Sequence, residues 1–382
     1  MSGTRRVIVV GAGIAGLAAA ARLADTGWEP TVIERAAARR RDGHALHLFG
    51  LGYGAAERMG LVPALRERVF GALDLVVTGA DGRPRFTVER ATTEALLGGR
   101  NLNLLRSDVE EVLHGAVAGR VPILFGRTVA AIDQDPSGVR AVLDDGSELT
   151  ADLLIGADGR RSAIRRLVLP EQDRLVDLGH TVAAFGMEPL AGQRPGSVRM
   201  WGRPGRMINV INPDGEHAKA FLAFTGPPST DDPKAVLTAA FGDLGGPVRA
   251  VLDAVPERRA MAFDRGAEVR LDRWSRGRVV LLGDAASLPS AFAGYGASLA
   301  IGGADLLAAA LCENDVPAAL PAWEAGLRPE VEQRQRRGRR SARRQLDRPT
   351  FLRDLPLRVA ALPPVAGLIQ RRARRASVVT RG

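Results

Sequence analysis

Residues 7–35, VIVVGAGIAGLAAAARLADTGWEPTVIER, constrain the fold of this chain more than any other segment. Four apolar β-branched residues, 7–10, come directly before a Gly-x-Gly-x-x-Gly motif, and residues 17–23 repeat apolar side chains at helical spacing. This pattern predicts a strand, a tight turn and a helix. The first glycine would form the turn, the second would admit a pyrophosphate, and the third would let helix and strand pack closely. The motif comprises Gly11, Gly13, Ile14, Ala15 and Gly16.

A second predicted strand, residues 31–33, ends at Glu34 and Arg35, where dinucleotide-binding folds carry an acidic residue. The Glu34 carboxylate can accept hydrogen bonds from both hydroxyls of an adenosine ribose, and it would repel a 2′-phosphate. The phosphates would lie at the helix N-terminus, where unpaired N–H groups and the helix dipole favour negative charge. Together these features predict a site for an adenine dinucleotide, either FAD or NAD.

The cysteine count and the lengths of the apolar stretches indicate the cellular compartment of the protein. The single cysteine, Cys312, excludes an internal disulfide framework and fits a reducing compartment. It lies in an alanine- and leucine-rich helical segment, so we expect it to be buried. No apolar stretch reaches transmembrane length without a Gly, Pro or charged residue, which predicts a cytoplasmic protein.

The net charge of +10 is concentrated at the C-terminus, because residues 328–382 contain 16 Arg and only 4 Asp or Glu. We interpret its most basic part, residues 334–344, as the solvated face of a helix. Contact with a membrane surface or an acidic partner is the alternative, because residues 352–369 are apolar and are followed by further arginines. Nucleic-acid binding is not expected, since no aromatic side chains interleave with the arginines.

The hydrophobic pattern predicts a second domain. Residues 73–90 read as a hairpin, and residues 171–274 contain several short alternating strands interrupted by one helix, 234–241. We therefore predict an α/β fold: a GxGxxG Rossmann-like domain with an inserted, mostly antiparallel β-sheet substrate domain and a C-terminal helical segment. The predicted boundaries are 1–72, 101–171 and 275–345 for the dinucleotide domain, 73–100 and 172–274 for the substrate domain, and 346–382 for a basic tail.

Two later segments have no purpose in a dehydrogenase that uses only a nicotinamide: DLLIGADGRRSAIR from residue 152 and GRVVLLGDAASLPSAFAGYGASLAIGGA from residue 277. Together with the first motif, and in the same order, they resemble the para-hydroxybenzoate hydroxylase family over roughly residues 5–345. These are single-component FAD-dependent monooxygenases, and they include tetracycline-inactivating enzymes. The resemblance implies bound FAD, NADPH or NADH as a transient co-substrate, and insertion of one oxygen atom from O2 into an aromatic or polycyclic apolar small molecule.

The resemblance also implies roles for residues on the adenosine side of FAD. Glu34 matches the ribose ligand, and Val129 would reach the adenine through its main chain. Arg106 matches an arginine that contacts the phosphate and ribose region. Its place in the sequence fits independently, because an arginine at a helix start can fork onto phosphate oxygens, and we expect Ser107 to N-cap that helix with Glu110 three residues on.

On the flavin side, Asp158 matches the family's DG motif, although it could serve as the N-cap of the next helix instead, or do both. Gly283 and Asp284 match the GD motif, in which the acid holds hydroxyls of the cofactor. Gly294, Gly296 and Ala297 would bring backbone close to the flavin ring. The sequence departs from the usual pattern after the GD motif, which affects the expected hydrogen-bond network and the substrate class. The departures are Ser287, Pro289, Tyr295, Ser298 and Gly303.

No side-chain nucleophile and no metal are expected, because the cofactor carries the difficult chemistry. A general base could activate a phenolic substrate. His44 and His47 lie on opposite faces of one predicted strand, so at most one of them would face the pocket. Phe292 and Tyr295 are expected to line it. Two other functions remain open: a flavin oxidase or reductase acting on an apolar substrate such as an isoprenoid, and a non-catalytic flavin-binding scaffold.

Overall fold

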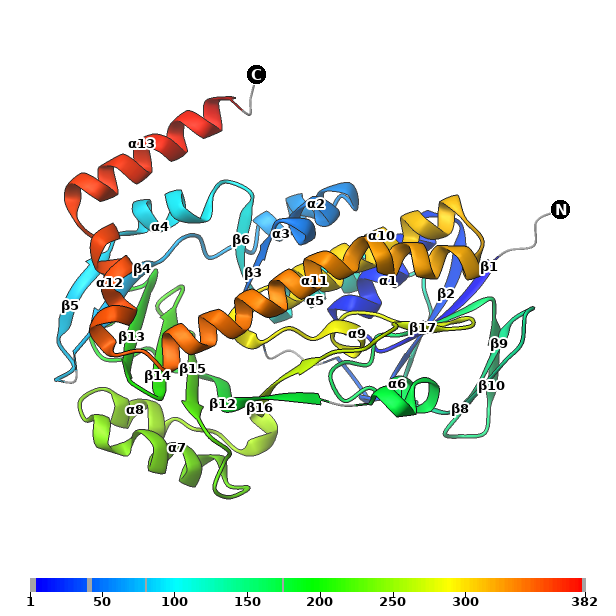
Figure 1. The fold of residues 1–382 in the computed structure, drawn as a ribbon, viewed down its shortest axis with the longest axis horizontal. Coiled ribbons are helices and arrows are strands. Elements are labelled where there is room, and N and C mark those ends of the chain that lie inside the picture. The colour runs from blue at the N-terminus through cyan, green and yellow to red at the C-terminus, as the bar shows by residue number, and fades with distance from the viewer. Residues whose placement is uncertain (1–4, 40–42, 80, 174, 380–382) are drawn as a thin grey trace.

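The computed structural model describes residues 5–39, 43–79, 81–173 and 175–379. Its main sheet has six strands in the order β17-β18-β11-β1-β2-β7 (Figure 1). The strand β1 pairs in parallel with both β2 and β11, so segments far apart in the sequence lie side by side. The strands are β1 (Arg5–Val10), β2 (Trp28–Glu34), β7 (Ile123–Phe125), β11 (Leu153–Gly156), β17 (Ser275–Arg276) and β18 (Val279–Leu281).

One helix, α1, packs against this sheet and contacts two further helices. The predicted helix after the glycine motif is α1 (Ile14–Asp25), and it lies against α10 (Gly296–Glu313) and α5 (Arg106–Val117). By length and composition α10 could cross a membrane, but 61% of it is buried inside the protein, as expected for a core helix. Cys312 is exposed near the end of α10. The expectation that it is buried was wrong, because the apolar pattern of the segment continues into a last turn that faces outward.

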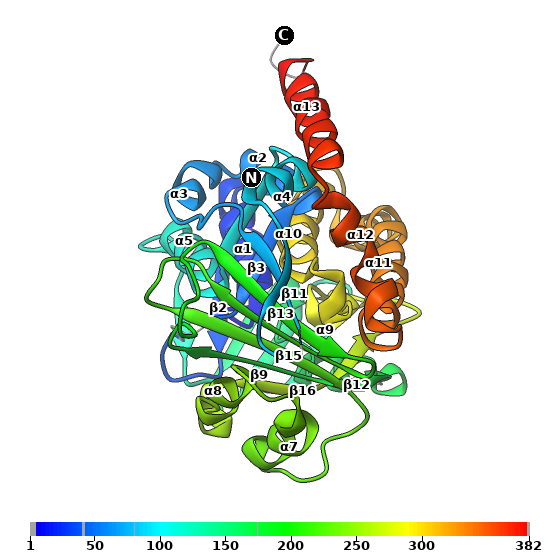
Figure 2. The same ribbon diagram turned by 90° about the vertical axis from the view of Figure 1, so that its left-hand side faces the viewer.

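The second sheet has seven strands in the order β16-β12-β15-β14-β13-β4-β5. All neighbouring strands are antiparallel except β13 and β4, so the predicted mostly antiparallel sheet is confirmed and includes the 73–90 hairpin. Helices α7 and α8 cover one face (Figure 2). The elements are β4 (Asp74–Thr78), β5 (Pro84–Val88), β12 (Leu175–Met187), β13 (Ser197–Arg203), β14 (Arg206–Asn212), β15 (Ala218–Thr225), β16 (Ala262–Val269), α7 (Pro233–Phe241) and α8 (Val248–Asp253).

A short antiparallel pair, β3 (Ala45–Phe49) and β6 (Asn101–Leu105), lies between the two sheets, and α5 follows β6 directly. The helix α5 begins at Arg106, two residues earlier than an N-cap at Ser107 requires, so that prediction was wrong. Asp108 accepts a hydrogen bond from the Leu105 N–H (3.4 Å) and replaces the predicted cap. The other short elements are β8 (Val129–Gln134), β9 (Val139–Leu143), β10 (Glu148–Ala151), α2 (Leu51–Arg58), α3 (Val62–Arg66), α4 (Arg90–Leu97), α6 (Ala163–Val168) and α9 (Asp284–Ser287).

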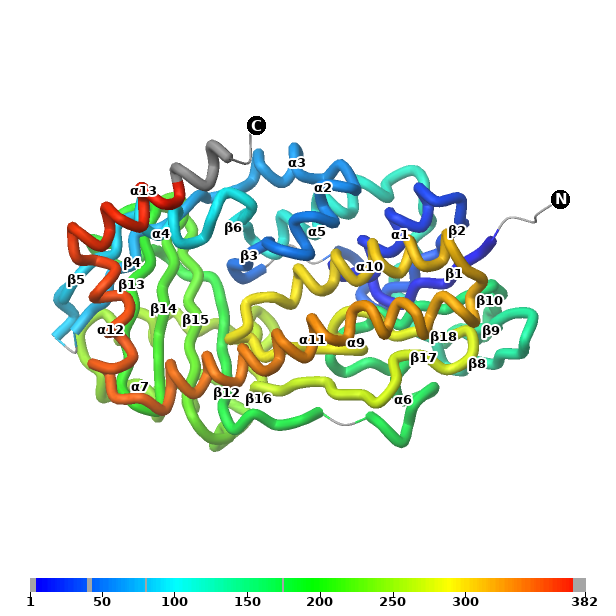
Figure 3. Tube along the Cα trace, turned by 45° about the horizontal axis from the view of Figure 1, so that its top comes forward, coloured from blue at the N-terminus to red at the C-terminus, as the bar shows by residue number. Residues whose placement is uncertain are grey.

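The long helix α11 (Val316–Leu346) runs along the molecule from the six-stranded sheet to the seven-stranded sheet (Figures 1 and 3). At its first end Trp323 Nε1 donates to the carbonyl of Gly303 in α10 (2.9 Å). At its other end Leu346 packs against Met207 and Ala223 of the second sheet. The segment predicted only as a basic tail forms two more helices, α12 (Thr350–Ala360) and α13 (Pro363–Val379).

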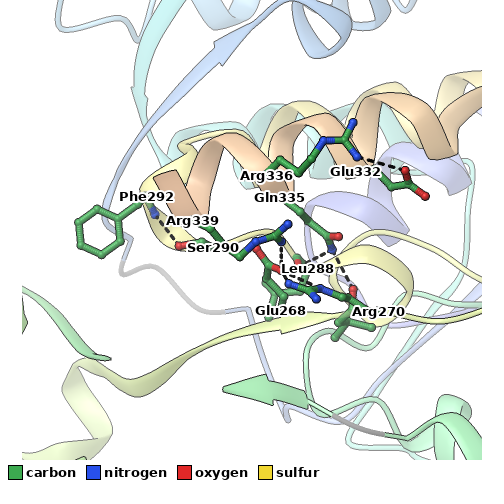
Figure 4. A network of polar contacts seen from close by, with 10 residues as sticks. Glu268, Arg270, Leu288, Ser290, Phe292, Glu332, Gln335, Arg336 and Arg339 are labelled. Carbon is green, nitrogen blue, oxygen red and sulfur yellow. Dashed lines mark hydrogen bonds and ion pairs between the residues drawn. The ribbon is translucent and has the colours of Figure 1, made fainter. Parts of the chain in front are cut away.

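A buried polar network fixes the middle of α11 (Figure 4). Glu268 on β16 is fully buried and forms ion pairs with Arg270 (2.7 Å) and with Arg339 of α11 (2.6 Å). One turn earlier, Gln335 Nε2 donates to the carbonyls of Val269 (2.9 Å) and Leu288 (3.2 Å). The network therefore ties α11 both to the second sheet and to the segment that follows the GD motif.

Candidate active site

The glycine motif has the geometry that its sequence predicts. Gly11 turns the chain with φ 110° and donates its N–H to the Ile33 carbonyl (2.7 Å). A Cβ atom on Gly16 would lie 1.8 Å from the Gly11 oxygen, so the close packing of helix and strand requires glycine. A Cβ on Gly13 would meet only the Arg106 guanidinium, at 3.9 Å. Gly13 thus presents open backbone at the N-terminus of α1, where Ile14 and Ala15 begin the helix.

Glu34 joins the end of β2 to the glycine loop. Its carboxylate accepts hydrogen bonds from the N–H groups of Ala12 and Ala36, both at 2.8 Å. Arg35 beside it is exposed. The N–H of Arg127 donates to the Glu34 carbonyl (3.1 Å), which brings the start of β8, with Val129, close to this end of the site.

Arg106 at the start of α5 reaches toward the same loop. Its guanidinium pairs with Glu110 (2.9 Å) one turn later and remains 45% exposed. Its backbone N–H donates to the His44 carbonyl (2.9 Å), so the start of α5 is fixed to the segment before β3. The side chain lies beside Gly13 with donors that remain accessible.

The GD motif lies against α1. A Cβ on Gly283 (φ 61°) would lie 2.7 Å from the Ala15 Cβ. Within the described residues the Asp284 carboxylate makes no hydrogen bond. Burial raises the pKa of Asp284, and the charges of Arg106 and Arg160 oppose that shift.

The N-terminus of α10 faces Asp284. Gly296 begins the helix, and a Cβ there would meet only the Asp284 Oδ1, at 3.9 Å. Gly294 adopts the left-handed conformation with φ 59° and has no atom within 4 Å of an added Cβ. Ala297 is half-buried in the first turn. The open backbone at the N-terminus of α10 and the Asp284 carboxylate are therefore neighbours.

Asp158 caps α6 through its side chain. Its carboxylate accepts hydrogen bonds from Ser162 Oγ (2.6 Å) and from the N–H groups of Ala163 (2.6 Å) and Ile164 (3.2 Å). Its Cα also lies beside Gly11. The prediction of Asp158 as the N-cap residue was wrong, because Ser162 holds that position, but the Asp158 carboxylate accepts hydrogen bonds from the first turn of α6.

Arg165 connects the DG and GD segments. Its side chain is 1% exposed and donates to Asp173 (2.7 Å) and to the carbonyls of Ala285 (3.0 Å) and Arg160 (2.8 Å). Ala285 directly follows Asp284, so this buried arginine holds α6 and α9 together. In the sequence only its position after the DG motif indicated a role.

A cavity of about 330 Å³ lies among the seven-stranded sheet, the β3–β6 pair and α12. Most of its wall is apolar, and its polar groups come from six separate elements. The apolar lining residues are Ala45, Phe70, Leu73, Leu75, Leu97, Val198, Met200, Trp201, Met207, Ile211, Pro356 and Leu357, and the polar ones are His47, Thr93, Asn103, Asn209, Arg344, Gln345, Arg353 and Asp354.

Of the two candidate histidines, only His47 lines this cavity. Its Nδ1 lies 2.5 Å from the Asn103 Oδ1, and Asn103 Nδ2 donates to the Gly71 carbonyl (2.7 Å). Because the amide oxygen can only accept, His47 carries its proton on Nδ1 and keeps an unshared electron pair on Nε2. His44 directly precedes β3 instead of lying on its other face as predicted, and burial and the Arg106 charge lower its pKa to about 4.

The two aromatic residues expected in the pocket lie elsewhere. Tyr295 is 1% exposed, its hydroxyl accepts a hydrogen bond from the Leu51 N–H (2.9 Å), and the Arg334 guanidinium covers its ring at 3.6 Å. Phe292 packs edge-on against Phe221. Neither residue lines the cavity, because the Arg334 guanidinium covers the Tyr295 ring and the Phe221 ring packs against Phe292.

Asn209 is a cavity residue that sequence reasoning missed. It lies on the same face of β14 as Met207, and its buried Oδ1 has no hydrogen-bond partner within the described residues. Strand alternation places it on this face, but it does not distinguish a cavity wall from a packed interface. The Asn103 amide was missed for the same reason.

The two sheets and the three glycine-containing loops define a flavoprotein of the dinucleotide-binding type with a separate small-molecule cavity. The family model described as "FAD binding domain" matches residues 4–315, and the chain belongs to this family. A flavin-dependent monooxygenase from an unknown prokaryotic organism is 28% identical over 347 residues, covering 87% of this chain and 88% of the relative.

Two further comparisons support the same assignment. The 2-heptyl-3-hydroxy-4(1H)-quinolone synthase of Mycobacteroides abscessus is 31% identical over 341 residues, covering 86% of this chain and 87% of that enzyme. The crystal structure of tetracycline destructase Tet(55) matches with a TM-score of 0.84 and 26% identity, covering 98% and 97% of the two chains. The chain is therefore a flavin-dependent monooxygenase with FAD as its cofactor, as the sequence resemblance predicted.

Proposed function

We propose that this monooxygenase uses NADPH or NADH and O2 to hydroxylate an aromatic or polycyclic apolar molecule bound in the cavity. The observation that carries this proposal is the largely apolar cavity of about 330 Å³ with the unshared electron pair of His47 at its wall. This volume lies in the lower part of the range for small-molecule sites. The names of the quinolone and tetracycline enzymes fit a fused-ring substrate of secondary metabolism or antibiotic modification.

The residues around the glycine loops fit FAD. Glu34 and Arg35 would bind the adenosine ribose end, with Val129 near the adenine. Gly11, Gly13, Ile14, Ala15 and Gly16 would hold the pyrophosphate together with Arg106, whose guanidinium has accessible donors beside Gly13. Asp158, Gly283 and Asp284 would contact the central part of the cofactor, and Gly294, Gly296 and Ala297 would contact the flavin.

The fit to FAD rests on two glycines with open backbone and on the charged side chains beside them. A Cβ on Gly13 or Gly296 would meet only Arg106 or Asp284, which are the charged groups expected to hold the cofactor. When bound, FAD takes electrons from the reduced nicotinamide and delivers one oxygen atom of O2 to the substrate. The Gly296 end of α10 would favour negative charge on the flavin.

His47 would act as the general base. Asn103 fixes the proton on Nδ1, so Nε2 can accept a proton from a phenolic or enolic hydroxyl of the substrate. Loss of that proton pushes electron density into the ring carbon that is oxygenated. The apolar wall would orient the ring and exclude water, and the Asn209 Oδ1 could accept a hydrogen bond from a second donor of the substrate.

Replacing His47 with Gln should lower kcat about 10²–10⁴-fold. Asn103→Asp keeps an acceptor for the Nδ1 proton, so it should retain activity that Asn103→Leu loses. His217→Gln is the matched control, because His217 is exposed and 68% of its side chain is accessible. An unchanged kcat in His47→Gln would remove His47 from the mechanism.

The direct test of the function begins with the absorbance spectrum of the purified protein under anaerobic conditions. NADPH or NADH should bleach the flavin in the presence of a hydroxylated aromatic ligand, and isotopically labelled O2 should place one labelled oxygen atom in the product. Bleaching without labelled product would favour an oxidase or reductase of an apolar substrate. Bound flavin that neither nicotinamide reduces would favour a non-catalytic scaffold.

We also propose the division into a FAD-binding domain (1–72, 101–171 and 275–345), a substrate domain (73–100 and 172–274) and a C-terminal basic segment (346–382). The separate sheets and their separate hydrophobic cores support it. A cytoplasmic location is part of the proposal and agrees with the single exposed cysteine.

A further inference from the structure

Exposed apolar side chains are concentrated in the segment that forms α12 and the start of α13. Of the ten exposed large apolar side chains in the described parts of the chain, six lie between residues 351 and 368. Phe351 is 71% exposed, and Leu355, Val359 and Leu362 follow it at helical spacing, with exposures of 49%, 43% and 49%. They form a single stripe along α12 and its C-terminal turn, which we call the α12 stripe. A contiguous exposed apolar patch of this kind marks an interaction surface.

The surroundings of the α12 stripe are strongly basic. Residues 336–372 contain 11 Arg and only two acidic residues. One of the two, Asp354, is buried and paired with Arg353 (2.7 Å). Arg348, Arg358 and Arg371 are exposed around the stripe. Apolar side chains flanked by exposed arginines are suited to a surface that is apolar below and negatively charged at its boundary with water.

We propose that the α12 stripe docks on the surface of a membrane that contains anionic lipids. The apolar side chains would enter the headgroup region, and the arginines would pair with lipid phosphates. A second copy of the chain fits less well, because a two-fold symmetric interface would place the same basic surface against itself. Figure 1 shows α12 at the end of the molecule far from the six-stranded sheet.

Docking would place the proposed substrate cavity beside the membrane. The other side of α12 lines the cavity with Arg353, Asp354, Pro356 and Leu357. An apolar substrate dissolved in the bilayer would then enter close to where it accumulates. This consequence rests on the proposed function, whereas docking itself does not.

Flotation of the full FAD-loaded chain with lipid vesicles tests the proposal. The protein should float with vesicles of phosphatidylcholine and phosphatidylglycerol but not with phosphatidylcholine alone, and added NaCl should weaken binding. The combined change Phe351→Asp, Leu355→Asp and Val359→Asp should lower the partition coefficient about tenfold or more. Leu167→Asp, on an exposed leucine of α6, is the matched control and should bind like the wild type.

A second variant shows whether a folding defect, rather than loss of the apolar stripe, explains weaker binding of the first variant. Arg348→Gln with Arg358→Gln and Arg371→Gln keeps the apolar stripe and should also reduce binding to anionic vesicles. The flavin spectrum reports folding independently of monooxygenase activity. Wild-type protein that stays in solution with anionic vesicles would overturn the proposal. So would a wild-type dimer that dissociates in the triple aspartate variant, because the stripe would then bind a second copy.

Discussion

Single methyl groups on two glycines of the first motif should separate folding from cofactor binding. In Gly16→Ala the new Cβ would lie 1.8 Å from the Gly11 oxygen, whereas real Cβ atoms essentially never come within 3.0 Å of such a neighbour. The helix α1 must therefore shift by about 1.2 Å against the sheet, since both contact atoms belong to tightly packed elements. We expect the apoprotein to lose about 3 kcal/mol or more of unfolding free energy.

In Gly13→Ala the methyl group meets no protein atom closer than 3.9 Å, and the backbone φ of −83° suits alanine. Stability of the apoprotein should change by less than about 1 kcal/mol. The methyl would instead occupy the space proposed for the pyrophosphate, which should weaken FAD binding by about 2–3 kcal/mol, or roughly 100-fold in Kd.

Urea unfolding of the apoproteins and fluorescence titration with FAD measure the two effects separately. The expected result is a stability defect in Gly16→Ala and an affinity defect without a stability defect in Gly13→Ala. Wild-type FAD affinity in Gly13→Ala would refute the assignment of its open backbone to the cofactor. Wild-type stability in Gly16→Ala would refute the packing argument.

Two other predictions concern buried ionisable groups. Arg165→Met should lower the free energy of unfolding by about 3–5 kcal/mol, because Asp173 and two carbonyls lose their donor. The control is Arg166→Met on the exposed side of α6, which should change the free energy of unfolding by less than about 0.5 kcal/mol. Equal effects of the two variants in urea unfolding would contradict the bridging role of Arg165. Burial lowers the pKa of His180, so His180 stays neutral in the fold while an unfolded histidine gains a proton below about pH 6.5. Wild-type stability should therefore fall relative to His180→Asn between pH 8 and pH 5, and a constant difference between the two unfolding free energies would count against this.

The sequence was sufficient for features that depend on local pattern. The glycine spacing predicted the turn at Gly11 and the close packing at Gly16, because both follow from the strand–turn–helix geometry alone. The order of the three motifs predicted the family, and the alternating segments predicted the second sheet. The same pattern predicted that at most one of His44 and His47 would face the pocket, and of the two only His47 lines the cavity.

Features that depend on contacts between distant segments could not be read locally. His47 and Asn103 are 56 residues apart and become neighbours only through the register of β3 and β6. Tyr295 was expected in the pocket, but Arg334 from α11 covers its ring. The start of α5 was misplaced because the helix is capped at Leu105, whose N–H donates to Asp108, rather than at Ser107.

A chain built from interchangeable modules could acquire a new substrate range by swapping one sheet for another, but α11 prevents this here. Its first half is buried in the core of the six-stranded sheet through Trp323 and Leu327, and its last residue, Leu346, packs against Met207 and Ala223 of the other sheet. Recombination that replaced either sheet would leave one end of α11 packed against a surface that does not match it. Divergence of such a protein must therefore proceed by substitutions on the cavity wall, with the scaffold inherited whole.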